Sequence, residues 1–210
     1  ARARATRERI FQVAGDLFAE RGFAGTSVGD IATAAGVNRQ RLYAYFGSKR
    51  DLYREVLIAV YAEVAHDEDL LSLTPADLGA MTGRIVDRFF AIHEDNPRFW
   101  RLLCWENLNG GESLHGEDWE RLRAAYIAHL GGLYAEGQRR GVFRPEVDFT
   151  TYLLVLFSTT YFYFSNQMTI SRLLGVALDS QAVRRQIEEQ FVGVMDRGLT
   201  PGAMPSAALG

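Results

Sequence analysis

Apolar residues recur along this chain at the 3.6-residue spacing of amphipathic helices, and the alternation typical of strands is nearly absent. The first apolar face lies before Gly22 and is formed by Ile10, Val13, Ala14, Leu17 and Phe18. A glycine after the last periodic residue is a common helix stop. The pattern therefore predicts an all-α protein.

Signals for helix starts and stops divide the next segment into short pieces. Ser27, with an acidic residue three positions later, opens a short helix that ends near Gly36, and Asn38 caps the following helix. Ser48 begins a fourth helix, whose apolar face is formed by Leu52, Val56, Ala59, Val60 and Val64. Three helices are thus expected before residue 47, and a connecting helix over 48–66 leads out of them.

Longer helices are expected in the rest of the chain. Thr74-Pro75 supplies a cap and a first-turn proline, and Asn96-Pro97 breaks the pattern again. The segments with helical periodicity are 74–94, 98–108, 117–140, 149–175 and 180–198. We therefore place a second, larger helical domain at 48–198 and a flexible tail at 199–210.

One segment, 149–171, contains no charged residue and could be mistaken for a membrane span. It holds five threonines and three serines, together with Asn166 and Gln167. A lone lipid-facing helix usually carries fewer polar groups. We expect no membrane partner and interpret the segment as a helix that is covered on most sides, within the subunit or between subunits.

Charge is distributed unevenly along the chain. The net charge is −3, but residues 1–55 carry ten Lys and Arg against six Asp and Glu, whereas residues 56–210 carry thirteen against twenty. A basic head on an acidic body is expected of a DNA-reading module attached to another domain. The single cysteine, Cys104, excludes an internal disulfide and indicates a reducing, cytoplasmic location. Four histidines leave little material for a metal site, and we expect no cofactor.

The segment 27–46 carries the clearest functional signal. Ile31 and Ala32 lie on the inner face of a short helix, and the small side chain of Ala32 lets a second helix approach closely. Gly36 can adopt the positive φ of a tight turn before that second helix. This spacing is typical of a helix-turn-helix, whose second helix enters the major groove of DNA. The alternative is an αα-hairpin with a glycine turn and no role in DNA binding.

Residues 23–32, 35–37 and 42–52 resemble the N-terminal domain of TetR-family transcriptional regulators. The resemblance covers residues 7–55 without a gap. It implies an N-terminal three-helix helix-turn-helix DNA-binding domain at 1–47, followed by a larger helical ligand-binding and dimerisation domain. One departure is Arg41, which stands where the family commonly has Thr or Ser. The operator sequence therefore cannot be inferred from relatives.

The resemblance implies a set of DNA contacts for which these side chains are chemically suited. Arginine pairs with guanine, and asparagine and glutamine pair with adenine. The residues expected to read base edges are Asn38, Arg39, Gln40 and Arg41. Those expected to contact phosphates are Thr26, Ser27, Tyr43, Tyr45 and Lys49. Tyr45 fits core packing equally well, and the arginines at 2, 4 and 7 form either an arm toward the minor groove or a solvated start.

The larger domain contains many aromatic residues with polar atoms, more than a simple core usually holds. The resembled family binds its inducer in this domain, and a mostly apolar cavity with a few polar groups is the usual form of such a site. The candidate ligand-binding residues are Phe90, His93, Trp100, Cys104, Trp105, Tyr126, His129, Phe157, Thr160, Tyr161 and Phe164. The cations that could face an anion are few, namely Arg84, Arg88, Arg101 and Arg172. We therefore expect a small, largely apolar or aromatic effector, and a plain aromatic core is the alternative.

In the resembled family, the last two helices pack against their copies in a partner subunit. We therefore expect a homodimer with Phe162, Ile187, Phe191 and Val194 at its interface. The function expected is that of a ligand-responsive repressor, released by its effector from a pseudo-palindromic operator. We expect no enzymatic activity, since HExxH, Walker and G-x-G-x-x-G motifs are absent. The alternatives are a helical small-molecule-binding protein or enzyme, and an architectural DNA-binding protein without an effector.

Overall fold

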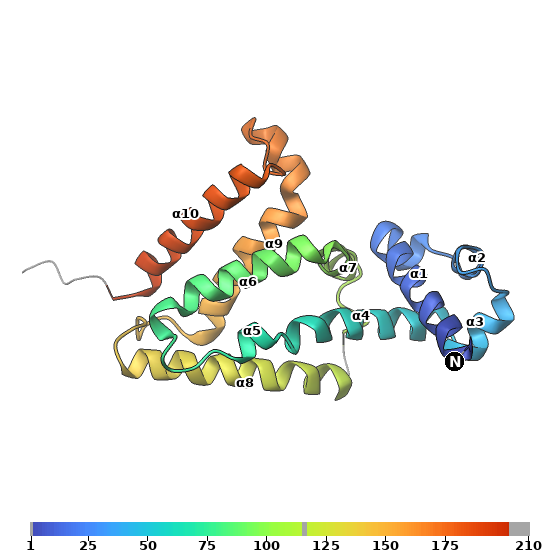
Figure 1. Ribbon diagram of the computed structural model, residues 1–210, viewed down its shortest axis with the longest axis horizontal. Helices are drawn as coiled ribbons and strands as arrows, with labels where there is room; N and C mark the ends of the chain where they lie inside the picture. The colour runs from blue at the N-terminus through green and yellow to red at the C-terminus, as the bar shows by residue number, and fades with distance from the viewer. Residues whose placement is uncertain (1, 115–116, 202–210) are drawn as a thin grey trace, which may run out of the picture. The chain divides into compact units, whose positions relative to one another are not determined.

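Residues 2–114 and 117–201 are described by the computed structural model, and within these ranges the chain forms helices and loops but no strand (Figure 1). The predicted all-α fold is confirmed. Contacts between Cα atoms divide the chain into two units. Unit 1 comprises residues 1–65 and 96–124, and unit 2 comprises residues 66–95 and 125–210. The chain therefore crosses from one unit to the other three times.

The helices are distributed between the units as follows. Unit 1 contains α1 (Arg2–Gly25), α2 (Val28–Ala34), α3 (Arg39–Phe46), α4 (Lys49–Ala65), α7 (Pro97–Leu108) and the start of α8 (Glu117–Arg139). Unit 2 contains α5 (Glu68–Leu71), the short 3-10 helix η1 (Leu78–Ala80), α6 (Met81–Asp95), the rest of α8, α9 (Phe149–Leu174) and α10 (Gln181–Leu199). The boundary predicted at residue 47 falls inside unit 1, because α4 and α7 both pack on α1. Of the predicted tail, residues 202–210 lie outside the described residues.

The predicted ends of the short helices are confirmed, since local hydrogen bonds set them. Ser27 Oγ accepts from the Asp30 backbone N–H (3.1 Å), and the Asp30 carboxylate accepts from the Ser27 N–H (2.9 Å), so the capping box is complete. Asn38 Oδ1 accepts from the Arg41 N–H at 2.8 Å. Gly36, in the turn between α2 and α3, has a φ of 61°. These contacts orient α3 relative to α2.

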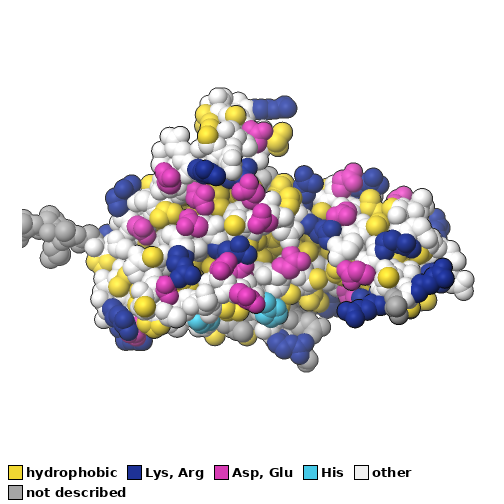
Figure 2. Space-filling model, viewed as in Figure 1, with side chains coloured by type: hydrophobic (Ala, Val, Ile, Leu, Met, Phe, Trp, Pro, Cys, Tyr) yellow, Lys and Arg dark blue, Asp and Glu magenta, His cyan; other side chains and the backbone are white. Residues whose placement is uncertain are grey.

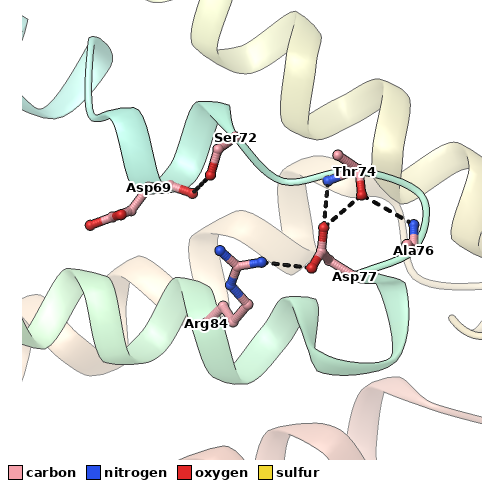
Figure 3. Close-up of polar contacts among 6 residues, drawn as sticks. All are labelled: Asp69, Ser72, Thr74, Ala76, Asp77 and Arg84. Atoms are coloured by element: carbon pink, nitrogen blue, oxygen red, sulfur yellow. Dashed lines mark hydrogen bonds and ion pairs between the residues drawn. The ribbon is translucent and has the colours of Figure 1, made fainter.

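The predicted helix start at Thr74-Pro75 is wrong. The Asp77 carboxylate accepts from the backbone N–H and the hydroxyl of Thr74 at 2.8 and 2.7 Å, which closes a turn over 74–77 (Figure 3). Arg84 donates to the other Asp77 oxygen at 2.7 Å and ties this turn to α6. The segment therefore turns before η1, and the regular helix begins only at Met81.

In unit 1, α7 is fixed to α1 through Gly22 and Trp105. Gly22 interrupts the helical geometry of α1 with φ 72° and ψ 175°. Trp105 lies directly over it, so close that a Cβ at position 22 would lie 2.7 Å from the indole ring. The indole N–H donates to the Ala19 carbonyl at 3.2 Å. A second link is buried, where the Tyr53 hydroxyl of α4 donates to the Glu106 carboxylate of α7 at 3.0 Å.

In unit 2, α6 is the central helix and packs against both α9 and α10. Aromatic rings pack around Tyr134 of α8, whose ring centroid lies 4.7 Å from that of Phe143 and 4.5 Å from that of Tyr152. Asp and Glu side chains are spread over the face of this unit that Figure 2 shows. None of the helices in the described part of the chain is long and apolar enough to cross a membrane.

Candidate DNA-binding surface and effector site

Helix α3 separates an inner apolar face from an outer polar one. Leu42 and Phe46 are buried in unit 1. The outer face exposes Arg39, Gln40, Arg41 and Tyr43. The outer face of this helix therefore presents guanidinium, amide and hydroxyl groups to solvent, which are the groups that hydrogen-bond base edges and phosphates. The Asn38 amide oxygen is engaged in capping α3, which leaves its NH2 group available as a donor.

Two of the expected phosphate contacts are used inside unit 1 instead. Thr26 is completely buried, and its hydroxyl lies 2.9 Å from the Gly22 carbonyl and 3.1 Å from the Leu17 carbonyl. In this arrangement the Thr26 hydroxyl cannot reach a phosphate. The Lys49 ammonium donates to the Phe23 and Thr26 carbonyls at 2.7 and 2.8 Å, and burial lowers the pKa of Lys49.

The remaining members of this set are placed differently. Ser27 is exposed, although its hydroxyl caps α2, and Tyr45 is half-buried with its ring 6.4 Å from that of Phe46. Arg7 lies within α1, where it forms an ion pair with Glu55 and stacks over the Phe46 ring at 4.6 Å. Arg7 is therefore a structural residue of unit 1 in this conformation. Sequence reasoning missed this, since the partner lies 48 positions away.

Residues 25–29 also fit the G-x-S-x-G spacing of many serine hydrolases, a match that sequence reasoning missed. In those enzymes the serine sits between a strand and a helix. Here the segment follows helix α1, and Ser27 Oγ donates to the Asp30 carboxylate at 2.6 Å as part of the capping box. The spacing therefore reflects a helix cap.

Eight of the eleven predicted effector residues lie in unit 2, and five of these are joined by ring contacts. His93 of α6 is buried, and its ring lies 6.0, 6.3 and 5.4 Å from the rings of Phe157, Tyr161 and Phe164 on α9. Phe90 also contacts Phe164, at 5.5 Å. Burial lowers the pKa of His93 to about 4, so this imidazole is neutral at pH 7. We call these five side chains the α6–α9 aromatic cluster.

Polar atoms within unit 2 are divided between paired and unpaired groups. Tyr126 of α8 is buried, and no residue in the described ranges offers its hydroxyl a hydrogen bond; the same is true of His129 Nε2. Thr160 is fully buried, with its hydroxyl turned back to the Leu156 and Phe157 carbonyls at 3.1 Å. A buried hydroxyl without a partner costs about 1–3 kcal/mol. A ligand that accepts a hydrogen bond from Tyr126 would remove this cost.

Of the four cations that could balance an anionic ligand, two are engaged in ion pairs and two are exposed. Arg84 pairs with Asp77, and Arg88 pairs with the buried Asp67 at 2.7 Å. Arg101 is exposed and stacks over Trp100 at 5.3 Å, and Arg172 is exposed on α9. The described cations of unit 2 named here therefore give no support to a charged ligand.

Three predicted effector residues are not in unit 2. Trp100, Cys104 and Trp105 all lie on α7, which belongs to unit 1. Trp105 has the structural contacts with Ala19 and Gly22 described above. The aromatic spacing of residues 89–105 looked continuous, but the break at Asn96-Pro97 assigns its two halves to different units.

The predicted dimer residues lie on and beside an apolar groove of about 660 Å³ between α9 and α10. Its lining residues are Ser158, Thr159, Tyr161, Phe162, Tyr163, Ile170, Leu174, Leu178, Ile187, Gln190 and Phe191. Phe162 is 52% exposed and Val194 is 62% exposed. Phe191, in contrast, also packs inward, with its ring 6.2 Å from that of Phe90. Figure 2 shows hydrophobic side chains at the projecting α9–α10 end as well.

Two family models match this chain. The model described as bacterial regulatory proteins of the tetR family matches residues 10–56, and the one described as the C-terminal domain of tetracyclin repressor-like proteins matches residues 80–195. The first match spans α2, the turn and α3. The second includes the whole of α6, α7, α8 and α9. The likeness thus extends over residues of both units.

Individual relatives agree with these matches. The HTH-type transcriptional repressor NicS of Pseudomonas putida is 35% identical over 181 residues, which are 84% of each chain. The HTH-type transcriptional regulator RutR of Escherichia coli K12 is 27% identical over 94% of this chain and 92% of its own. The crystal structure of a TetR family transcription regulator from Marinobacter aquaeolei VT8 shares the fold, with a TM-score of 0.71 at 21% identity, over 95% of this chain and 97% of that one.

Proposed function

This chain belongs to the TetR family of bacterial transcriptional regulators, and from that premise we propose that it is a homodimeric repressor released from its operator by a small, uncharged, largely apolar molecule. The observation that carries the DNA-binding part is the outer face of α3, where Arg39, Gln40 and Arg41 are exposed on a helix fixed by its caps. The relatives named above are regulators, which supports regulation rather than catalysis. Binding to chromosomal DNA implies a cytoplasmic location.

The proposed effector site is the α6–α9 aromatic cluster, and we propose that Tyr126 of the same unit also contacts the ligand. A neutral His93, a buried unpaired Tyr126 hydroxyl and the ion pairs of Arg84 and Arg88 all favour an uncharged ligand. Such a molecule would stack on the rings and accept a hydrogen bond from Tyr126. An apolar site with a few placed polar groups is the usual form of a small-molecule pocket.

The proposed dimer uses the groove between α9 and α10. The exposed Phe162 and Val194 would be covered by the same helices of a second copy. Contiguous exposed apolar surface on a water-soluble domain commonly marks a protein interface. A two-fold dimer places two α3 helices in successive major grooves, so the operator should be a pseudo-palindrome.

Two crossings of the chain offer routes by which an effector could alter DNA binding. Helix α4 ends at Ala65, where the chain passes from unit 1 to unit 2. Helix α6 ends at Asp95, and only Asn96 separates it from α7. Because α6 carries His93 and α7 is fixed to α1, a shift of α6 would be passed to the DNA-binding helices through the backbone. A coupling free energy of about 1–3 kcal/mol changes affinity about five- to 150-fold. The effector must favour the state that does not bind DNA.

The test has two stages. Selection of duplexes from a random pool by the purified protein should yield one pseudo-palindromic sequence. That duplex is then used in a fluorescence-anisotropy screen of a library of uncharged and charged aromatic metabolites. Release by uncharged members supports the proposal. A selected sequence without two-fold symmetry would contradict the dimeric operator binding. Release only by charged library members would contradict the uncharged effector.

Tyr126→Phe sharpens the effector assignment, since it removes only the hydroxyl. The ligand-free variant should be as stable as the wild type or more stable, by about 1–3 kcal/mol, because a buried unpaired hydroxyl is lost. The releasing concentration of the effector found in the screen should rise. Tyr161→Phe, at a half-buried position in the aromatic cluster, is the matched comparison. Equal effector response of Tyr126→Phe and wild type would remove Tyr126 from the site.

A further inference from the structure

The first turn of α2 contains a glycine where a helix gains nothing from one. Gly29 is the second residue of α2, and glycine in a helix costs about 1 kcal/mol relative to alanine. The space that its side chain would fill is occupied by Arg39 of α3. A Cβ at position 29 would lie 2.7 Å from Arg39 Nη2 and 3.4 Å from both Cζ and Nε. The guanidinium of Arg39 therefore lies across the α-carbon of Gly29.

Two features of the surroundings favour this position of Arg39. The Asn38 cap fixes the start of α3, from which the Arg39 side chain turns back toward α2. Beside Gly29, the Asp30 carboxylate accepts from the Ser27 N–H and hydroxyl, and these hydrogen bonds hold the pKa of Asp30 below its usual value, with smaller contributions from the charges of Arg21 and Arg39. The ionised Asp30 attracts the guanidinium, yet Arg39 remains exposed overall. Its remaining donors are available to a ligand.

This position changes what Arg39 can touch on DNA. In a helix-turn-helix, the second helix enters the major groove while the first crosses the phosphate backbone. A guanidinium that lies on the first turn of α2 is placed for the backbone, whereas Gln40 and Arg41 extend from the exposed face of α3. Arginine binds phosphate through two parallel hydrogen bonds.

We propose that Gly29 is a positioning residue that seats Arg39 on α2, so that Arg39 binds a backbone phosphate and leaves base recognition to Gln40 and Arg41. This revises the expectation from sequence that Arg39 reads a base. The inference rests on the proposed operator binding. According to this proposal, the absence of a side chain at position 29 determines which residues contact the DNA backbone and which contact the bases.

The first experiment separates a phosphate contact from a base contact. Full-length wild type, Arg39→Ala and Arg39→Lys each select duplexes from a random pool, and affinities for the wild-type sequence are measured over a range of NaCl concentrations. Arg39→Ala should select the same DNA sequence as the wild-type protein and bind it about tenfold or more weakly. The slope of log affinity against log salt concentration should be smaller by about two, because a dimer loses two phosphate contacts. Arg39→Lys keeps the charge and should retain most of the wild-type slope. A changed base preference in either variant would overturn the proposal.

The second experiment tests the seat itself. Gly29→Ala should weaken operator binding about three- to tenfold in the wild-type background, because the methyl group displaces the guanidinium, and less than about twofold in the Arg39→Ala background. Thermal unfolding of Gly29→Ala should be unchanged or shifted upward, since alanine favours the helix. Gly132→Ala, at a helical glycine of α8 with open space around its α-carbon, is the control and should leave DNA binding unchanged.

Two results would contradict the proposal that Gly29 positions Arg39. Equal weakening by Gly29→Ala in both backgrounds would mean that the α2 backbone itself must approach the DNA at Gly29, independently of Arg39. Wild-type affinity of Gly29→Ala would mean that the guanidinium needs no seat. If the wild type itself selected no duplex, the proposed function would fail before any variant was compared, and this inference would fail with it.

Discussion

At the scale of single residues, Lys49 shows how a charge expected to face DNA is used by the fold. Its ammonium bridges the Phe23 and Thr26 carbonyls and lies 4.1 Å from the centre of the Phe23 ring. Lys49→Met keeps the apolar stem but leaves both carbonyls without this donor. We expect a loss of about 1–3 kcal/mol in the free energy of unfolding, measured by urea denaturation. The neighbouring exposed cation supplies the control, Arg50→Met, which should change stability little.

Unchanged stability of Lys49→Met, combined with weaker binding to every duplex, would restore Lys49 to the phosphate contacts expected from sequence. The structure instead predicts that the main effect of Lys49→Met is a lower free energy of unfolding. This comparison also separates what sequence can indicate about a residue from what it cannot. The type and location of Lys49 were evident, but its partners lie 26 and 23 positions away, and only the packed fold brings them together.

His93 predicts a pH dependence of stability. Burial lowers its pKa to about 4 from an ordinary value of 6.5, so the unfolded chain binds more protons than the folded one between these values. Stability should therefore fall as the pH decreases from about 6.5 toward 4, by up to about 3 kcal/mol. Burial raises the pKa of Asp87, Glu188 and Asp196, which acts in the opposite direction. Those carboxylates are common to the wild type and a variant.

The measurement is therefore a difference. Thermal unfolding of the wild type and of His93→Phe is followed from pH 7 to pH 4.5, and the variant should lose less stability over this range. Parallel curves for the two proteins would contradict a neutral buried His93.

At the scale of elements, helix ends with local signals were predictable, and those without them were not. The boxes at Ser27 and Ser48 and the cap at Asn38 involve residues three positions apart, so the sequence contains the whole interaction. The turn at 74–77 has a similar local bond, but Thr74-Pro75 resembles a helix start until the Asp77 side chain is seen to close the turn. The sequence pattern predicted no helix at α5, which has four residues and is capped by Asp67.

Gly22 provides the prediction at this scale, since it joins α1 and α7. Gly22→Ala would place a side chain where φ is 72°, at a cost of about 1–3 kcal/mol, and would also press a methyl group against Trp105. We expect a total loss above about 2 kcal/mol in urea denaturation, with altered tryptophan fluorescence. Gly132→Ala adds the same group in open space and should be neutral or stabilising. Wild-type stability of Gly22→Ala would show that α7 is not held in this way.

At the scale of the whole molecule, the sequence indicated two functional parts but not their composition. The charge asymmetry placed the division near residue 55, and motif spacing placed it near 47. The structure groups α4 and α7 with the N-terminal helices because Tyr53, Trp105 and Glu106 make contacts that are distant in sequence. Because of these contacts, the three expected effector residues on α7 belong to unit 1. Long-range pairings of this kind leave no periodic signal.

The dimer prediction also belongs to this scale. Phe162→Glu places a charge on a half-exposed apolar position of α9, where a second copy would have to bury it, and should give folded monomers. Phe191 is a poorer choice, because it also packs on Phe90. Leu108→Glu, at a 78% exposed position of unit 1, is the control and should remain dimeric. Multi-angle light scattering at micromolar concentration decides between these outcomes, and a wild-type monomer would refute the dimer.

The central claim is that two copies of this chain read one operator through their α3 helices. The most direct test is the affinity for the selected duplex and for a shuffled duplex of the same composition, with the number of bound chains determined by analytical ultracentrifugation. We predict two chains per duplex and binding at least about 10³-fold tighter than to the shuffled duplex at physiological salt. Equal affinity for the two duplexes, or a single chain bound to the selected one, would contradict the account.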